Sequence, residues 1–281
     1  MRAFQKSQPI GVYDSGVGGL TVLKTLREKF PHENFVYFGD TLNLPYGTKS
    51  QEQIVHYSRN IITWLVQGPR VKLVVAACHT SSALALEEIS KEFDVPIIGT
   101  IHPLVKSLLK KEAPQKIGIL ATPASVKSLT HERIFMKAGF QGEIVSIACP
   151  DFVPLIEAEN WDGNALKKCA EMYLKIVETK KLNALIYGCT HYPFIKAIIE
   201  EILPASVTTI DPALHIALEV FERLSKENLL NDAKVKGKSE FLCGSDPQAF
   251  AEKIQRLAGF ENSNVVLKDV HSSEMTSNRV F

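Results

Sequence analysis

The fold of this chain is decided by residues 71–85, VKLVVAACHTSSALA. Their first half is a run of small and branched apolar residues, which is typical of a strand buried on both faces of a parallel sheet. Residues 82–93 then follow a helical pattern. Between strand and helix stand Cys78, His79 and Thr80, at the edge where open α/β sheets bind ligands. The stretch therefore predicts a parallel α/β sheet with chemistry at its carboxyl edge.

The same alternation of strand and helix runs along the whole chain. We predict strands at residues 9–14, 34–40, 72–78, 96–99, 116–123, 143–150, 183–189 and 207–212, with helical segments between them. Strands separated by helices in this rhythm imply parallel sheets covered by helices on both faces. We expect the last dozen residues, 270–281, to form a frayed tail because they are polar and unpatterned.

The chain also contains a weak internal sequence repeat, which we call the echo. Residues 10–12 (Ile-Gly-Val) open one unit and residues 117–119 (Ile-Gly-Ile) open a second. Cys78 and Cys189 follow these openings at nearly the same distance, and each is followed within two residues by a threonine and a histidine. We therefore expect two similar, pseudo-symmetric α/β units that face each other over a cleft, each with one thiol at the end of a parallel strand.

Composition excludes several classes of protein. The 281 residues carry 32 basic and 31 acidic side chains without a long basic run, so nucleic acid is not an expected partner. No segment has the roughly 18 apolar residues of a membrane span, and the first residues lack the apolar core of a signal peptide, so we expect a cytoplasmic protein that does not bind membranes. The five cysteines have no CxxC spacing, which argues against disulfides and a zinc site.

A single strand cysteine is usually a small packing residue. Cys149, Cys169 and Cys243 are interpreted in that way, because they lack a counterpart with similar flanks. Cys78 and Cys189 occupy matching places and have polar neighbours, so we interpret them as functional thiols.

Two thiols on opposite walls of a cleft suit one kind of chemistry. A disulfide exchanger usually keeps its pair close in sequence, and a thiol hydrolase needs only one nucleophile. Inversion of a carbon centre needs one group to remove a proton from one face and another to deliver a proton to the opposite face. A thiol, with an ordinary pKa near 8.5, can serve in either role after a modest shift.

Three further side chains are candidates to assist these thiols. Asp14 ends the first strand, and would lie near Cys78 if the two strands pair, whereas His191 lies two residues after Cys189. Asp14 also fits a turn residue, His191 a cap after a turn and Glu157 a solvated helix residue. The loop at residues 14–21, DSGVGGLT, departs from the dinucleotide pattern G-x-G-x-x-G and fits either an anion-friendly wall with Ser15 or a tight turn.

Five segments in order resemble the glutamate racemase family, the cofactor-independent branch of the aspartate/glutamate racemases. They are GVYDSGVGGLTVL (11–23), YFGDTLNLPYGTKS (37–50), VVAACHTSSA (74–83), ACPDFVPLIEAE (148–159) and LIYGCTHYP (185–193). The resemblance extends from about residue 8 to beyond residue 240. It implies interconversion of L- and D-glutamate without a cofactor or metal, a supply of D-glutamate for peptidoglycan, and a homodimer.

The resemblance also implies the residues of the site. Cys78 and Cys189 match the two catalytic cysteines, and Asp14, Glu157 and His191 match the groups that assist them. The expected substrate-binding residues are Asp14, Ser15, Pro45, Tyr46, Gly47, His79, Thr80, Thr122, Thr190 and His191. One position departs from the family pattern, because the family has asparagine after the first cysteine and His79 stands there in this chain.

Domain boundaries follow from the echo and the resemblance together. We expect residues 1–101 and 209–281 to form the domain that carries Cys78, and residues 102–208 the domain that carries Cys189. In this interpretation VTTIDP (207–212) begins a strand and helix that return to the first domain. A racemase for aspartate or another amino acid, and more distantly a non-catalytic amino-acid binding protein, stay open as alternatives.

Overall fold

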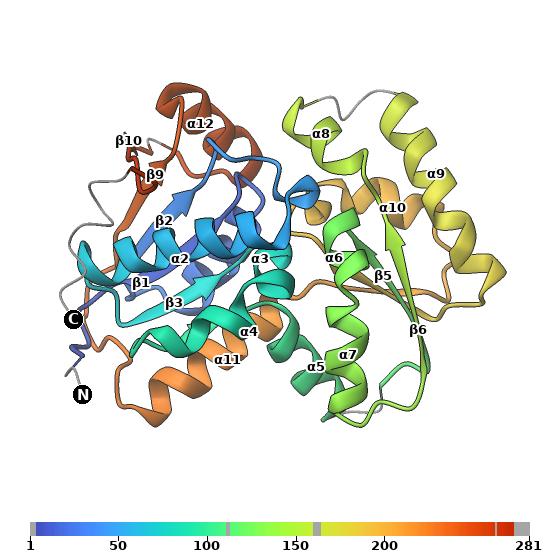
Figure 1. Cartoon of the computed structure of the whole chain (residues 1–281), viewed down its shortest axis with the longest axis horizontal. Coiled ribbons are helices and arrows are strands. Elements are labelled where there is room, and N and C mark those ends of the chain that lie inside the picture. The colour runs from blue at the N-terminus through green and yellow to red at the C-terminus, as the bar shows by residue number, and fades with distance from the viewer. Residues whose placement is uncertain (1–3, 111–112, 160–163, 262, 273–281) are drawn as a thin grey trace.

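The computed structural model describes residues 4–110, 113–159, 164–261 and 263–272. Two parallel β-sheets lie side by side in it, each covered by helices, so the predicted α/β class with two mainly parallel sheets is confirmed. Figure 1 shows the blue, cyan and red segments gathered around one sheet and the green and yellow segments around the other.

The first sheet has six strands in the order β10-β9-β2-β1-β3-β4, and every pairing is parallel. The strands are β1 (Ile10–Asp14), β2 (Phe35–Gly39), β3 (Leu73–Ala76), β4 (Ile97–Ile98), β9 (Ser239–Cys243) and β10 (Val265–Leu267). β1, β2 and β3 are buried along their whole length, which is why their sequences are continuous apolar runs rather than alternating ones.

The second sheet has four parallel strands in the order β6-β5-β7-β8. They are β5 (Lys116–Ala121), β6 (Glu143–Ala148), β7 (Ala184–Gly188) and β8 (Thr208–Ile210). In each sheet the strand that leads to a candidate cysteine, β3 or β7, pairs directly with the strand that opens its unit, β1 or β5. The sequence echo therefore corresponds to equivalent strand neighbours in the two sheets.

The helices connect and cover these strands. They are α1 (Leu20–Lys29), α2 (Gln51–Gln67), α3 (His79–Leu84), α4 (Leu86–Ile89), α5 (Ile101–Leu109), α6 (Pro123–Ser128), α7 (Thr130–Lys137), α8 (Phe152–Glu157), α9 (Asn164–Thr179), α10 (Lys196–Ile202), α11 (Ala213–Lys226) and α12 (Pro247–Lys253). Short one-turn helices include η1 (Tyr46–Thr48) and η3 (Tyr192–Ile195). Among the described residues, no helix combines the length and the apolar character that crossing a membrane requires.

Local sequence signals explain where helices α2 and α6 begin. α2 starts at a capping box, in which the Ser50 hydroxyl accepts from the Gln53 backbone and the Gln53 side chain accepts from the Ser50 backbone. α6 starts after Thr122, whose hydroxyl accepts from the Ser125 backbone, with Pro123 at its first position. Both starts bring polar side chains to the same side of the molecule.

Two sequence expectations are wrong in detail. VTTIDP was expected to return to the first unit, but β8 pairs with β7 and completes the second sheet, so the return begins with α11. The expected frayed tail is partly ordered, because Val270 is buried and His271 lies 3.2 Å from the Asp40 carboxylate. The remainder of that tail, residues 273–281, lies outside the described residues.

The hydrophobic core is continuous between the two sheets. One cluster of buried side chains joins Ala83 of α3 and Leu104 of α5 to Ile117, Ile119 and Ile186 of the second sheet. Burial of such side chains stabilises the folded chain by about 1.5–3 kcal/mol each. The cluster therefore links the two sheets by packing as well as by chain connections.

A buried ion pair lies at the opposite end of the first sheet from the candidate site. The Lys72 ammonium, just before β3, donates to Glu33 Oε2 at 2.6 Å and to the carbonyl oxygens of Lys6 and Leu229. Neither Lys72 nor Glu33 is exposed by more than 3 %. The pair ties the amino ends of β2 and β3 to the segment that follows α11.

Candidate functional site

Cys78 and Cys189 follow equivalent strands of the two sheets and line one cavity of about 50 Å³. Cys78 directly precedes α3, and Cys189 lies between β7 and η3. Both thiols are free and buried. The structure therefore brings together the two residues that the sequence singled out, although they are more than a hundred positions apart.

Most of the predicted binding residues line the same cavity. These are Ser15, Pro45, Tyr46, Gly47, His79, Thr80, Thr122, Thr190 and His191. Asp14 and Glu157 do not line it; each lies behind the wall and contacts a residue that does. The wall also contains residues that sequence reasoning did not place there: Thr48, Pro123, Cys149, Pro150, Val153 and Pro154.

His191 connects Cys189 to two charged side chains. Its Nδ1 lies 3.8 Å from the Cys189 sulfur, and its Nε2 lies 2.7 Å from Glu157 Oε1. The second oxygen of Glu157 accepts from the Lys253 ammonium at 2.7 Å. These contacts form one series, from the Cys189 sulfur through His191 and Glu157 to Lys253 of α12.

The residues in this series of contacts stabilise one another's charged forms. Burial alone would lower the pKa of His191, but its contacts with Cys189 and Glu157 raise that pKa well above the ordinary value. Burial alone would raise the pKa of Glu157, but His191 and Lys253 bring it down to about 2. At neutral pH His191 is therefore an imidazolium and Glu157 a carboxylate.

Cys78 has a different environment. Burial and the nearby Asp14 carboxylate raise the pKa of its thiol to about 12. Asp14 is fully buried at the end of β1, and both of its oxygens accept from the Thr190 hydroxyl at 3.1 Å. Burial raises the pKa of Asp14 to about 6, even though His191 and Thr190 oppose that shift. The two cysteines therefore differ, because an anion lies near Cys78 and a cation contacts Cys189.

Two glycines allow the walls of the site to approach each other. A side chain at Gly18 would lie 2.4 Å from the Thr190 hydroxyl and 2.5 Å from the His191 ring. A side chain at Gly47 would lie 2.8 Å from Thr122, which belongs to the other half of the molecule. The glycine-rich loop before α1 thus packs directly against the residues that follow Cys189.

Polar contacts join α3 to the helices of the second sheet beside the cavity. The Thr80 and Thr122 hydroxyls lie 3.0 Å apart, and the Ser125 hydroxyl contacts both. Further along the same boundary, the Thr130 hydroxyl donates to the Ala83 carbonyl at 2.9 Å. We call this boundary between α3 and helices α6 and α7 the seam.

Two histidines stack across the seam. The His79 and His131 ring centroids are 6.0 Å apart, and their planes differ by 16°. His79, at the start of α3, lines the cavity and is 3 % exposed, whereas His131, on α7, is 1 % exposed. His131 was not singled out from the sequence, since nothing in its local pattern relates it to residue 79.

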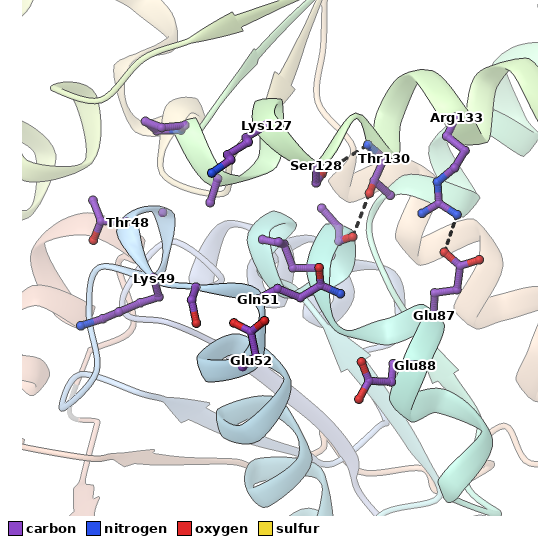
Figure 2. Close-up of a pocket in the computed structure, with 16 residues that line it drawn as sticks. Thr48, Lys49, Gln51, Glu52, Glu87, Glu88, Lys127, Ser128, Thr130 and Arg133 are labelled. Atoms are coloured by element: carbon purple, nitrogen blue, oxygen red, sulfur yellow. Dashed lines mark hydrogen bonds and ion pairs between the residues drawn. The ribbon is translucent and has the colours of Figure 1, made fainter.

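A larger outer cavity of about 890 Å³ adjoins the one that the two cysteines line and shares Gly47, Thr48 and Pro123 with it. Figure 2 shows Lys49 and Lys127 on opposite sides of this outer cavity, before α2 and on α6 respectively. The same view shows Arg133 of α7 paired with Glu87 of α4. In the described part of the chain, no cluster of three or more His, Cys, Asp or Glu side chains could hold a metal ion.

Fold and site together define a racemase: residues 20–219 match the Asp/Glu/Hydantoin racemase family, and the chain belongs to this family of isomerases. It is 41 % identical over 256 residues to a glutamate racemase of Trichodesmium erythraeum, covering 91 % of this chain and 93 % of that protein.

Solved structures agree. A glutamate racemase isoform from Bacillus anthracis superposes with a TM-score of 0.89 at 30 % identity. The match covers 95 % of this chain and 99 % of the Bacillus anthracis chain. Glutamate racemase from Francisella tularensis, solved with D-glutamate, has a TM-score of 0.86 at 32 % identity, covering 94 % of this chain and 98 % of its own.

Proposed function

We propose that this protein is a glutamate racemase that interconverts L- and D-glutamate with Cys78 and Cys189 as its two acid–base groups. One observation carries the proposal: two buried thiols from equivalent strands of the two sheets line a single cavity. The names of the similar proteins support glutamate as the substrate.

The unequal surroundings of the thiols suit opposite roles. Cys78, with its raised pKa, holds a proton and is the acid of the ligand-free site. Cys189 faces the His191 imidazolium and is the base, taking the α-proton of the substrate as Cys78 protonates the opposite face. After one turnover the protons have exchanged sides, so the same pair serves the reverse reaction.

The assisting residues act through the thiols. His191 presents a charged N–H to Cys189, and Glu157 and Lys253 hold that ring in its orientation and charge state. Asp14 accepts from Thr190 and places a carboxylate near Cys78. Ser15, Thr80, Thr122 and Thr190 provide neutral hydroxyl groups for a substrate with two carboxylates and one ammonium.

The wider setting is proposed on the family resemblance. We propose that the product D-glutamate serves peptidoglycan synthesis, that the protein acts in the cytoplasm, and that it forms a homodimer. We also keep the two-domain division as a proposal, with the second domain extended to Ile210 because β8 pairs with β7.

Incubation with L-glutamate in deuterated water, without added cofactor, tests the proposed reaction. We expect the circular dichroism of the amino acid to decay and deuterium to appear at its α-carbon. A parallel incubation with L-aspartate should show neither change. Racemisation of aspartate alone would assign the alternative substrate, and the absence of change with any amino acid would leave only a binding function.

Replacement of the thiols tests their roles. We expect Cys78→Ala and Cys189→Ala each to lower kcat by about 10³-fold or more, because an acid or base is lost. Cys243→Ala is the matched control, since Cys243 is a buried thiol outside the cavity. Full turnover by either active-site variant would contradict a mechanism that uses two thiols.

A further inference from the structure

The stacked histidines on the seam are buried ionisable groups to which the mechanism assigns no proton transfer. His79 Nδ1 and both ring nitrogens of His131 are buried and have no hydrogen-bond partner among the residues that the structure describes. Buried polar atoms are normally paired, so three such nitrogens at one contact call for an explanation. Only His79 of the two lines the catalytic cavity.

The two rings come from opposite sides of the molecule. His79 is held by α3, which follows the first sheet, and His131 by α7, which packs on the second sheet through Ile134 and Phe135. The Thr130 hydroxyl, one residue before His131, fixes the start of α7 to the Ala83 carbonyl of α3. The position of the His131 ring relative to His79 is therefore set by neighbouring backbone contacts.

The surroundings keep both rings uncharged. Burial and then the neighbouring His131 ring hold the pKa of His79 well below its ordinary value. Burial lowers the pKa of His131 to about 4, and the carboxylate that opposes this shift, Glu132, also accepts from the Ser146 hydroxyl. Cys78, which precedes His79 in the cavity wall, holds its proton.

An uncharged imidazole has one nitrogen that donates a hydrogen bond and one that accepts, whereas an imidazolium has two donors and no acceptor. His79 lines the cavity, so its charge state decides which hydrogen bonds it can offer there. The ring can serve as a fixed binding group only while it stays neutral and keeps its orientation. Stacking on a second buried ring meets both conditions.

We propose that His131 is a positioning residue of the catalytic cavity: its ring stacks on His79 and holds that side chain toward the substrate as a neutral hydrogen-bonding group. The proposal rests on the proposed racemase function. His131 touches neither the substrate nor the reacting thiols, and acts only through His79.

The test compares the pH dependence of KM and kcat in the wild type and in His131 variants. We expect His131→Ala to raise KM for glutamate about tenfold with little change in kcat, since a binding group loses its orientation. It should also add an ionisation near pH 6.5 that the wild-type profile lacks, because the freed His79 ring becomes solvated. His131→Phe keeps a stacking ring and should retain the wild-type profile.

Two further variants separate positioning from simple loss of packing. Ile134→Ala removes a buried side chain from the same helix without touching His79, and should lower the melting temperature without adding an ionisation. His79→Asn places an amide, which cannot titrate, at the same position of the cavity wall. In that background, His131→Ala should add no ionisation.

Nitrogen NMR of the histidine rings gives a readout that is independent of turnover. We expect the His79 ring to stay neutral from pH 5 to 8 in the wild type and in His131→Phe, and to titrate in that range in His131→Ala. Titration of His79 near pH 6.5 in the wild type, or a wild-type KM and pH profile in His131→Ala, would overturn the proposal. If the wild type fails to racemise glutamate, the proposed function falls and the NMR titration alone decides the role of His131.

Discussion

Glu157 is the residue that joins the two cations behind Cys189. One oxygen contacts His191 and the other contacts Lys253, so this carboxylate orients the imidazole and, together with Cys189, raises its pKa. The sequence offered little to distinguish this glutamate from a solvated helix residue. Its importance follows from burial, which makes it depend on its two partners.

Glu157→Gln tests this arrangement. Cys189 and Glu157 both raise the pKa of His191, and the amide removes the contribution of Glu157. The imidazolium should therefore deprotonate at lower pH, and the alkaline limb of kcat/KM should move to lower pH by at least about one unit. Rate profiles between pH 6 and 10 measure the shift. Glu159→Gln, which removes only the partner of Arg256, should leave the profile in place. Coincident profiles for Glu157→Gln and the wild type would refute the role of Glu157.

Asp14 illustrates a functional group that destabilises the fold. Its pKa is 3.8 in an unfolded chain and is raised to about 6 by burial in the folded one. Below pH 3.8 both states are protonated and the carboxyl group has no effect on stability. Above pH 6 both are ionised, and the folded state bears the full penalty of about 3 kcal/mol.

Asp14→Asn should therefore stabilise the protein at pH 7.5 and leave its stability almost unchanged at pH 4, while racemisation is lost or greatly slowed. Urea unfolding at the two pH values measures the difference. Equal stabilisation at both values would show that ionised Asp14 carries no such penalty.

At the scale of elements, the first sheet has buried polar side chains at both ends of its strands. The carboxyl ends carry the site, and the amino ends carry the buried pair of Lys72 and Glu33. When one partner of a buried ion pair is removed, the other charge stays buried without compensation. Losing one partner should therefore cost more stability than the attraction within the intact pair contributes.

Lys72→Met should lower the free energy of unfolding by about 3–5 kcal/mol. A second change, Glu33→Leu, should restore part of this loss because it removes the unpaired carboxylate. Lys167→Met is the surface control, since its partner Glu201 is 62 % exposed, and it should change stability by less than about 0.5 kcal/mol. A loss of that small size for Lys72→Met would mean that the pair is dispensable.

Elements whose character is fixed by local sequence were predictable. Leu73–Ala76 and Ala184–Gly188 are apolar runs that stay buried on both faces, and the thiols that follow them were located by the internal echo. β8 was assigned to the wrong sheet because the sequence of a three-residue strand at a sheet edge does not indicate which strand it pairs with. Cys149, His131 and Lys253 were missed as parts of the site, since their relation to it depends on contacts between distant segments.

At the scale of the whole molecule, the outer cavity lies where the substrate would approach the catalytic one. Lys49 and Lys127 stand on its two sides, and Arg133, Glu52, Glu87 and Glu88 also line it, so the two lysines balance a wall that would otherwise be acidic. Glutamate carries a net negative charge at neutral pH. Cations at the mouth of a cleft raise the rate of encounter with an anion, and salt screens that effect.

The double variant Lys49→Glu/Lys127→Glu should lower kcat/KM about tenfold at low ionic strength, with kcat unchanged, and the difference should shrink in high salt. Lys234→Glu/Lys236→Glu makes the same change in net charge on the loop before β9 and should have little effect. Equal losses in the two double variants would show that only overall charge matters.

The contact between Lys253 and Glu157 has a consequence for protein synthesis. Lys253 is translated after every other residue of the site, and α12 must fold onto the earlier chain before the carboxylate behind His191 gains its second partner. A nascent chain that has emerged only as far as residue 238 would contain both thiols and the complete four-stranded sheet, yet it would lack β9, β10 and α12. Such a chain should remain inactive on the ribosome until its final segments emerge.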